Sequence, residues 1–249
     1  MLMNLDAARQ LPLCIDEAIA PPWNIRRSAR ARRLCARVHR DGRVDIVIPQ
    51  RAPATVVQDF MARHRNWIET KAAQARALAP PAAAFPPERI ALPALGRSLR
   101  VHLAGGRQPP RVRLLADGIL AIKGEVATQA ALRRALQRWL MACARVELGG
   151  MLRHIAAEHG FHYSGISIRR QRTRWGSCST RRRISLNVCL MFQPVDVVRY
   201  LLIHELAHTL HMNHSDRFWA TVARCCPNWR TLDRELLRGW RHVPSWLFS

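Results

Sequence analysis

Two histidines in the C-terminal half of the chain are spaced so that both could bind one metal ion. His204, Glu205 and His208 belong to the sequence HELAH, an HExxH motif. Residues four apart on a helix lie one turn apart on the same face, so both imidazoles can reach an ion at about 2 Å, the distance that zinc requires. Zinc lowers the pKa of a water that it binds to about 7, and the neighbouring Glu205 can accept the proton of that water. The motif therefore predicts a zinc-dependent hydrolase with Glu205 as the catalytic base.

The residues around this motif predict a mostly apolar helix. Pro194 is a suitable first residue, and the apolar pattern continues to Met212. Burying His204, Glu205 and His208 in such a helix costs free energy unless the three groups serve a common purpose. We therefore favour a metal site over histidines that are merely hydrogen-bonded inside a core.

A catalytic zinc site needs three protein ligands and one open position, so a third ligand must be found outside the motif. We assign it to His214. Asn213 can adopt the left-handed conformation that ends a helix, and Ser215 or Asp216 can cap the next helix. A tight turn between these two helices would direct His214 back towards the motif.

Two other residues are alternatives for the third ligand. His211 is closer to the motif, but a straight helix would carry its ring past the ion. Glu235, on a later predicted helix, corresponds to the distant carboxylate that some zinc peptidases use.

The elements that must position these residues begin with a β-rich region. Residues 33–38 and 43–48 alternate apolar and polar residues around Asp41-Gly42, which predicts a hairpin, and an amphipathic helix follows over residues 53–78. A stretch rich in Pro and Ala at 79–87 predicts a loop or a short linker. Further strands are expected at 99–103, 112–115 and 119–122.

The rest of the chain is predicted to be largely helical. A helix is expected over residues 127–159 and ends at Gly160, with Gly149 and Gly150 as a place where it can bend. Strands at 166–170 and 184–190 flank a polar loop, and further helices should begin near Ser215 and Thr231. We predict an α+β fold with a β-rich N-terminal region, residues 1–125, and a metallohydrolase domain, residues 126–249.

The composition points to a globular protein of a reducing compartment. No window holds the roughly 18 uncharged apolar residues that a membrane span requires, and residues 1–20 lack a basic stretch followed by an apolar core. The seven cysteines are odd in number and lack CxxC spacing, so neither a disulfide framework nor a cysteine zinc site is indicated. We expect most of them to be buried, and we expect a cytoplasmic protein without membrane association.

The formal net charge is +23, from 40 Lys and Arg against 17 Asp and Glu. This charge favours anionic partners such as nucleotides or nucleic acid, although an arginine-rich surface without a partner explains it equally well. The chain has no zinc ribbon, helix-turn-helix signature or basic patch interleaved with aromatic residues. Any contact with nucleic acid would therefore be of the non-specific phosphate kind.

Together these motifs resemble those of a known family. They are HELAH, Asn213-His214-Ser215, Phe218-Trp219, the segment RWGSC at residues 174–178, and Asn187 after a strand. The chain resembles the bacterial YgjP-like metallopeptidase family, which is related to the SprT-like and WLM zinc proteases, over about residues 26–240. The resemblance implies a minimal zincin domain in which His204, His208 and His214 bind Zn²⁺ and Glu205 is catalytic.

The resemblance also changes the interpretation of the polar loop. By its residues alone, the sequence QRTRWGSCS at 171–179 is typical of an ordinary loop. The family implies an active-site wall there, and the residues expected to bind substrate are Arg172, Arg174, Trp175, Gly176 and Ser177. The chain departs from the family at Val188-Cys189, where an aromatic residue commonly follows the strand asparagine.

Three functions suit such a site. The first is a zinc peptidase acting on peptides. The second is a nucleotide hydrolase, since YgjP-like proteins have been assigned nucleoside triphosphate pyrophosphatase activity, notably on UTP, and the seven arginines between residues 169 and 183 would suit phosphate oxygens. The third is a DNA-associated protease like the SprT-like relatives, or a nucleic-acid-binding protein. We favour the peptidase, although one activated water could attack either electrophile.

Overall fold

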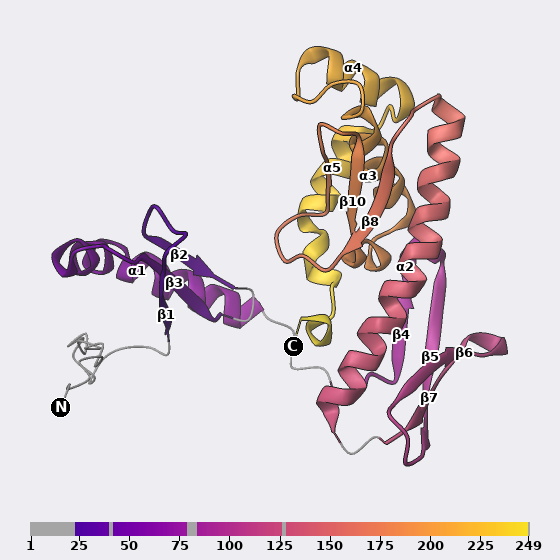
Figure 1. Cartoon of the computed structure of the whole chain (residues 1–249), viewed down its shortest axis with the longest axis horizontal. Helices are drawn as coiled ribbons and strands as arrows, with labels where there is room; N and C mark the ends of the chain where they lie inside the picture. The colour runs from indigo at the N-terminus through magenta and orange to yellow at the C-terminus, as the bar shows by residue number, and fades with distance from the viewer. Residues whose placement is uncertain (1–22, 40–41, 79–83, 126–127, 249) are drawn as a thin grey trace, which may run out of the picture. The chain divides into compact units, whose positions relative to one another are not determined.

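The computed structural model describes residues 23–39, 42–78, 84–125 and 128–248. These residues form two compact units, Met1–Pro81 and Ala82–Ser249 (Figure 1). Each unit has a hydrophobic core of its own.

The first unit is a small sheet with one helix. Its elements are β1 (Trp23–Ser28), β2 (Cys35–Val38), β3 (Val44–Pro49) and α1 (Ala54–Leu78). The strand order is β1-β3-β2, with β1 parallel and β2 antiparallel to β3. The expected hairpin is therefore present as β2 and β3, while residues 40–41 of its turn lie outside the described residues.

The core of the first unit forms between β3 and α1. Every second residue of β3 is buried, as the alternation of its sequence predicts. The buried residues are Val44, Ile46, Ile48, Val57, Ile68 and Ala72. Val56 and Trp67 are 46% and 51% exposed, so the apolar stripe of α1 is narrower than its sequence pattern suggested.

The second unit begins with a four-stranded sheet covered on one face by a long helix. The elements are β4 (Arg89–Leu92), β5 (Arg97–Gly105), β6 (Arg111–Leu114), β7 (Ile119–Gly124) and α2 (Gln129–His159). The strand order is β4-β5-β7-β6, and β5 and β7 are the parallel pair. α2 ends at Gly160, whose φ of 70° confirms the predicted stop, and it continues as one helix through Gly149 and Gly150.

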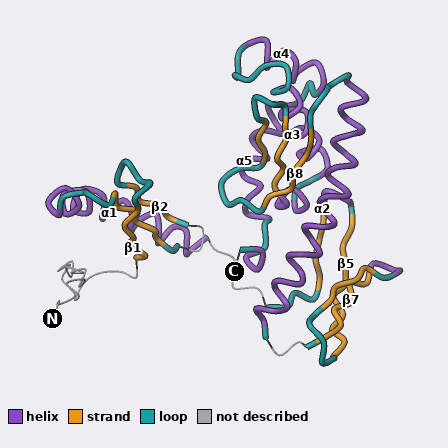
Figure 2. The backbone as a smooth tube through the Cα atoms, viewed as in Figure 1, coloured by secondary structure: helices purple, strands orange, loops and turns teal. Residues whose placement is uncertain are grey.

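A smaller sheet and three helices complete this unit. They are β8 (Gly165–Arg169), β9 (Gly176–Cys178), β10 (Arg183–Asn187), α3 (Val195–Ala207), α4 (Asp216–Cys225) and α5 (Trp229–Arg238). The strand order is β8-β10-β9, which leaves β9 at an edge, and β9 packs beside α3. Figure 2 shows α2 running along the unit beside both sheets. Short 3-10 helices lie at Pro93–Leu95, Ala116–Gly118, Val188–Phe192, Gly239–His242 and Ser245–Leu247.

The helix that carries the HExxH motif ends earlier than its apolar pattern predicted. The expectation was Met212, whereas α3 ends at Ala207. Thr209 uses both its backbone N–H and its hydroxyl to reach the carbonyl of Leu206, at 2.9 and 2.7 Å, and such three-residue bonds tighten the last turn. The turn does not use the left-handed backbone expected at Asn213, since Asp117 and Arg182 are the non-glycine residues with positive φ in the described chain.

The fold is α+β, as predicted. The division expected after residue 125 lies inside the second unit, because Leu120 and Ile122 of β7 belong to the same core as α2 and α3. A boundary there would cut through a continuous hydrophobic core. None of the helices in the described residues is long and apolar enough to cross a lipid bilayer.

Candidate metal centre

Three histidine rings meet at the C-terminal end of α3. His204 lies in α3, His208 directly follows its last residue, and His214 lies in the turn before α4. The ligand atoms of these residues all lie within 4.8 Å of one another. Nε2 of His204 is 3.2 Å from Nε2 of His214. The structure therefore brings together the three residues expected from the sequence, and their cluster is able to bind a metal ion.

Neighbouring groups orient two of the rings so that Nε2 faces the centre of the cluster. Nδ1 of His208 is 3.0 Å from the carbonyl oxygen of His211, so Nδ1–H donates there and Nε2 keeps its lone pair. Nδ1 of His204 lies 3.5 Å from the hydroxyl of Tyr200. That hydroxyl donates to Oδ1 of Asp233 at 2.8 Å, which leaves its oxygen to accept from His204. Both rings thus present the nitrogen that a metal needs.

The protonation of the cluster also suits metal binding. Burial, followed by the nearby rings of His208 and His214, lowers the pKa of His204 to about 3. Burial lowers the pKa of His208 as well. Neutral imidazole is the form that binds metal ions, and it is the form that these positions favour at neutral pH.

Two aromatic residues of α4 hold the rings in place. The ring of Phe218, which is fully buried, stacks on His208 at 4.5 Å and meets His204 edge to face at 4.9 Å. Trp219 stacks on His214 at 5.6 Å. These contacts fix three side chains that come from two separate elements, which gives the cluster a preformed geometry.

Glu205, the residue after His204 in α3, is a buried carboxyl group. It is 4% exposed, and burial raises its pKa to about 8. Its Oε2 is buried and has no hydrogen-bond partner among the described residues. An orphaned carboxylate oxygen is costly unless something binds to it, and a water next to a metal would supply the missing partner. Three histidines as ligands, with this carboxyl group as the neighbour of one of them in α3, fit a catalytic metal site.

The edge strand β9 passes very close to Glu205. A Cβ atom built on Gly176 would lie 2.5 Å from Oε1 and 2.9 Å from Cγ of Glu205. A side chain at this position would force the buried Glu205 side chain to shift, so glycine is what permits the close approach. The sequence placed Gly176 in the active-site wall, and the structure places it against the carboxyl group.

The other residues expected in the wall have different surroundings. The guanidinium of Arg172 donates to the carbonyl of Phe248 at 2.6 Å and lies 5.2 Å from its ring. Trp175 is 8% exposed, and its ring lies 4.1 Å from that of Trp240 at a tilt of 30°. Arg174 is exposed, and Ser177 is partly buried in β9. Their binding to substrate stays a prediction. The guanidinium of Arg172 is already engaged within the protein, whereas Nε1 of Trp175 is buried without a hydrogen-bond partner among the described residues.

Asn187 organises the loop that leads into β9. It is 1% exposed, and its Nδ2 donates to the carbonyls of Gln171 at 2.8 Å and Arg174 at 2.6 Å. Its Oδ1 accepts from the backbone N–H of Cys189 at 3.1 Å. Sequence reasoning noted this asparagine in the family resemblance but gave it no role. It holds the loop in position to bring Gly176 to Glu205.

Sequence reasoning missed Tyr200 and Asp233 and proposed two alternatives that lie outside the cluster. Tyr200 precedes His204 by one helical turn, which was the available signal, whereas Asp233 comes from α5. His211 reaches the site with its carbonyl oxygen, and Glu235 is exposed on α5. Among the described residues, neither joins the group that could hold a metal.

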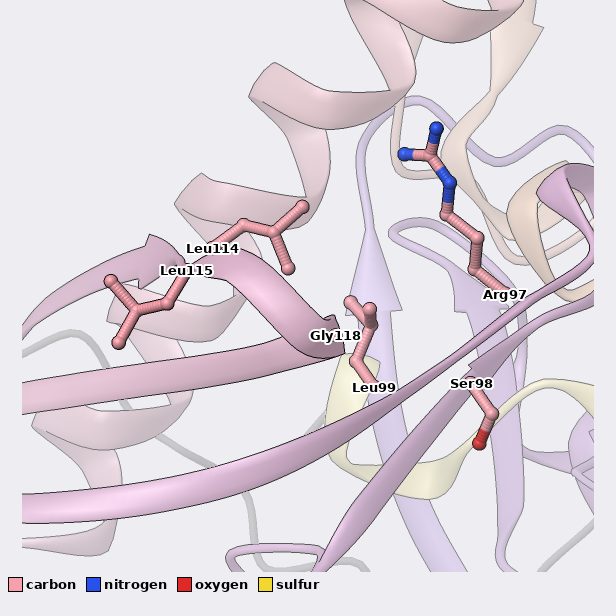
Figure 3. Close-up of a pocket in the computed structure, with 6 residues that line it drawn as sticks. All are labelled: Arg97, Ser98, Leu99, Leu114, Leu115 and Gly118. Atoms are coloured by element: carbon pink, nitrogen blue, oxygen red, sulfur yellow. The ribbon is translucent and has the colours of Figure 1, made fainter.

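A pocket elsewhere in the second unit is lined by few residues that could take part in catalysis or bind a metal. It encloses about 340 Å³ and is lined by Arg97, Ser98, Leu99, Leu114, Leu115 and Gly118 (Figure 3). Arg97 is the charged residue of this set, and none of the lining residues belongs to the histidine cluster.

The fold and the site define an α+β protein in which three histidines, at the end of α3 and in the turn that follows it, can bind a metal ion, and α3 also carries a buried carboxyl group. The chain matches the sequence model of the YgjP-like metallopeptidase domain over residues 32–238. It belongs to the YgjP-like metallopeptidase family.

Among solved structures, the chain is similar to the crystal structure of the metallopeptidase zymogen of Pyrococcus abyssi abylysin, with 23% identity and a TM-score of 0.34. That similarity covers 36% of this chain and 92% of abylysin. The comparison with curated proteins gives no match.

Proposed function

We propose that this protein is a zinc-dependent peptidase in which His204, His208 and His214 bind Zn²⁺ and Glu205 is the catalytic base. The observation that carries the proposal is the buried Glu205, whose Oε2 has no partner among the described residues and which follows His204 of the histidine cluster in α3. A carboxyl group placed in this way is poised to bind and deprotonate a water.

The bound metal and Glu205 have different roles in the proposed hydrolysis of a peptide bond. Zn²⁺, when bound, supplies a Lewis acid that polarises the scissile carbonyl and makes water more acidic. Glu205 accepts the proton of the attacking water on its unpaired oxygen and then passes it to the leaving amine nitrogen. The buried position of Glu205 excludes competing solvent, and Gly176 allows the backbone of β9 to approach the carboxyl group closely.

An extended peptide is the substrate that we propose. β9 pairs with β10 on one side and is an edge strand of its sheet. A free strand edge can bind an extended chain through backbone hydrogen bonds. Because β9 also packs beside α3, a peptide added there would run past Glu205.

The proposal includes a cytoplasmic location. All six cysteines of the described residues are free, which suits a reducing compartment. Cys189 and Cys226 are buried, three others are partly buried and Cys35 is exposed, so fewer are fully buried than expected.

A nucleotide pyrophosphatase is the second candidate, based on the arginines between residues 169 and 183. Arg170 and Arg172 bind the carbonyls of Leu247 and Phe248. The remaining members of this group, Arg169, Arg174, Arg181, Arg182 and Arg183, are exposed. They are the arginines that a triphosphate would engage.

One experiment separates the two candidates. Zinc-loaded wild type and Glu205→Gln are incubated with an unfolded protein and, separately, with nucleoside triphosphates. We expect peptide cleavage that requires Glu205. Release of pyrophosphate that requires Glu205, without peptide cleavage, would overturn the peptidase assignment.

A further inference from the structure

The four-stranded sheet of the second unit has one face that α2 does not cover. Along β5, Leu99 and Val101 face the core, and Arg100 and His102 lie on the opposite side. Figure 3 shows the same alternation one step earlier, with Arg97 and Leu99 on one side of the strand and Ser98 on the other. The opposite face is therefore formed by every second residue of each strand.

This face is strongly basic. Its cations are Arg89 of β4, Arg100 of β5, Arg111 and Arg113 of β6, and Lys123 of β7, and all of them are exposed. The four strands contain no acidic residue. We call these five residues the basic face.

The strand register places like charges directly opposite each other. Arg89 pairs with Arg100, and Arg111 pairs with Lys123. Like charges in directly opposed positions of a sheet are destabilising. Among the described residues, no carboxylate forms an ion pair with any member of the basic face. The folded protein therefore carries a repulsion that an anionic partner would relieve, and such local conflicts are typical of functional surfaces.

The other side chains of this face limit the kind of anion. Most are small or weakly polar, namely Ala91, Ser98, His102, Ala104 and Ala121, and Ile119 is a larger apolar residue that is partly buried. A face without Trp, Tyr or Phe offers no platform for stacking single-stranded bases. It offers few acceptors for the 2′-hydroxyls by which proteins recognise double-stranded RNA. Its one large apolar side chain, Ile119, is partly buried, whereas insertion into a membrane needs several exposed ones.

We propose that the basic face binds the phosphate backbone of double-stranded DNA without preference for base sequence. Charge complementarity between five cations and a regular polyanion is the basis of this assignment. The proposal is independent of the metal site, because none of the five residues belongs to it.

The test compares two charge-matched variants of the full chain. The first is Arg100→Gln, Arg113→Gln and Lys123→Gln, which removes one cation from each of three strands. The control is Arg134→Gln, Arg138→Gln and Arg145→Gln, three exposed arginines of α2. Binding of a labelled DNA duplex of random sequence is measured by fluorescence anisotropy over a range of salt concentrations.

We expect the basic-face variant to bind DNA at least about tenfold more weakly, and its log-log salt slope to fall by about three, close to one per lost phosphate contact. The control should keep most of the affinity and slope. Relief of the Arg89–Arg100 and Arg111–Lys123 repulsions should also raise the melting temperature of the first variant at low salt, which additionally shows that it folds.

Three results would overturn the proposal. One is an equal loss of affinity in both variants, which would make net charge alone responsible. Another is tighter binding of wild type to single-stranded DNA or to vesicles containing phosphatidylserine than to the duplex. If the triple variant does not fold, the single variants Arg100→Gln and Arg113→Gln replace it in the same measurement. The third result is then a salt slope of DNA binding that is unchanged from wild type in both single variants.

Discussion

Tyr200 and Asp233 connect the helix of the metal centre to α5 through a hydrogen bond of 2.8 Å between the phenol oxygen and Oδ1. Tyr200 is 1% exposed, and its oxygen also lies 3.5 Å from Nδ1 of His204. Burial, and then the bond to Asp233, raises the pKa of Tyr200, so the phenol keeps its proton and its O–H donates a hydrogen bond to Asp233. Asp233 thus orients His204 through Tyr200.

We predict that Asp233→Ala and Tyr200→Phe each weaken zinc binding about tenfold, since partners of metal-binding histidines contribute tenfold to a hundredfold in affinity. Asp233→Asn keeps an acceptor for the phenol and should bind zinc nearly as wild type does. Chelator competition measures the affinities, with Glu235→Ala, an exposed acid on the same helix, as control. In a protein that already carries Tyr200→Phe, adding Asp233→Ala should not weaken zinc binding further. Additive losses in the double variant would contradict a relay through Tyr200.

Gly176→Ala is expected to keep the metal and lose hydrolysis. The new Cβ would lie 2.5 Å from Oε1 of Glu205, so the carboxyl group must move. A displacement of about 1 Å can cost about a hundredfold in rate. Metal content and rate are measured together, with Gly165→Ala in the same sheet as control, because its Cβ would meet only the mobile end of Arg183 at 3.2 Å. Full activity of the Gly176 variant would refute the close approach.

Asn187→Ala should lower the free energy of unfolding by about 3 kcal/mol. The substitution leaves two backbone carbonyls and one N–H without their partner, and each such loss costs about 1 kcal/mol or more. Urea denaturation followed by circular dichroism measures the change. A loss of only about 0.5 kcal/mol, as for an ordinary surface position, would show that Asn187 does not hold the loop.

The metal-free protein should lose stability as the pH rises from 6.5 to 8. Burial raises the pKa of Glu205 from 4.5 to about 8, so the folded protein keeps a proton that the unfolded chain releases. Burial lowers the pKa of His204 from 6.5 to about 3, which removes stability only as the pH falls below 6.5. Between pH 6.5 and 8 the change in stability therefore comes from Glu205 and not from His204. The free energy of unfolding should fall by at most about 2 kcal/mol over this range.

Urea denaturation in the presence of a chelator tests this dependence at several pH values. Glu205→Gln carries no titrating group at this position and should show a flatter profile than wild type over the same range. Parallel profiles for the two proteins would mean that Glu205 does not retain its proton in the folded, metal-free state.

The local part of the site could be predicted from the sequence, because its geometry follows from helical spacing. His204, Glu205 and His208 lie within two helical turns, and His214 lies in the short connection between α3 and α4. The contacts that complete the site join distant segments. Tyr200 and Asp233 are 33 residues apart, and Arg172 and Phe248 are 76 apart. No periodicity in a short window indicates such pairs.

The same reason explains the differences in the fold. The hairpin of the first unit and the end of α2 at Gly160 depend on turn residues and were predicted. The division at residue 125 was placed where strands give way to a helix, a local change in pattern. In the structure β7 and α2 share one hydrophobic core, to which Leu120 and Leu136 both belong. A local change in sequence pattern does not indicate such a shared core.

Metal analysis of purified wild type, His208→Ala and Glu205→Gln tests the central claim most directly. We predict equimolar zinc in wild type and in Glu205→Gln, with hydrolysis lost in the latter, and zinc lost from His208→Ala. Retention of zinc by His208→Ala at the affinity of wild type would contradict the assignment of the metal centre.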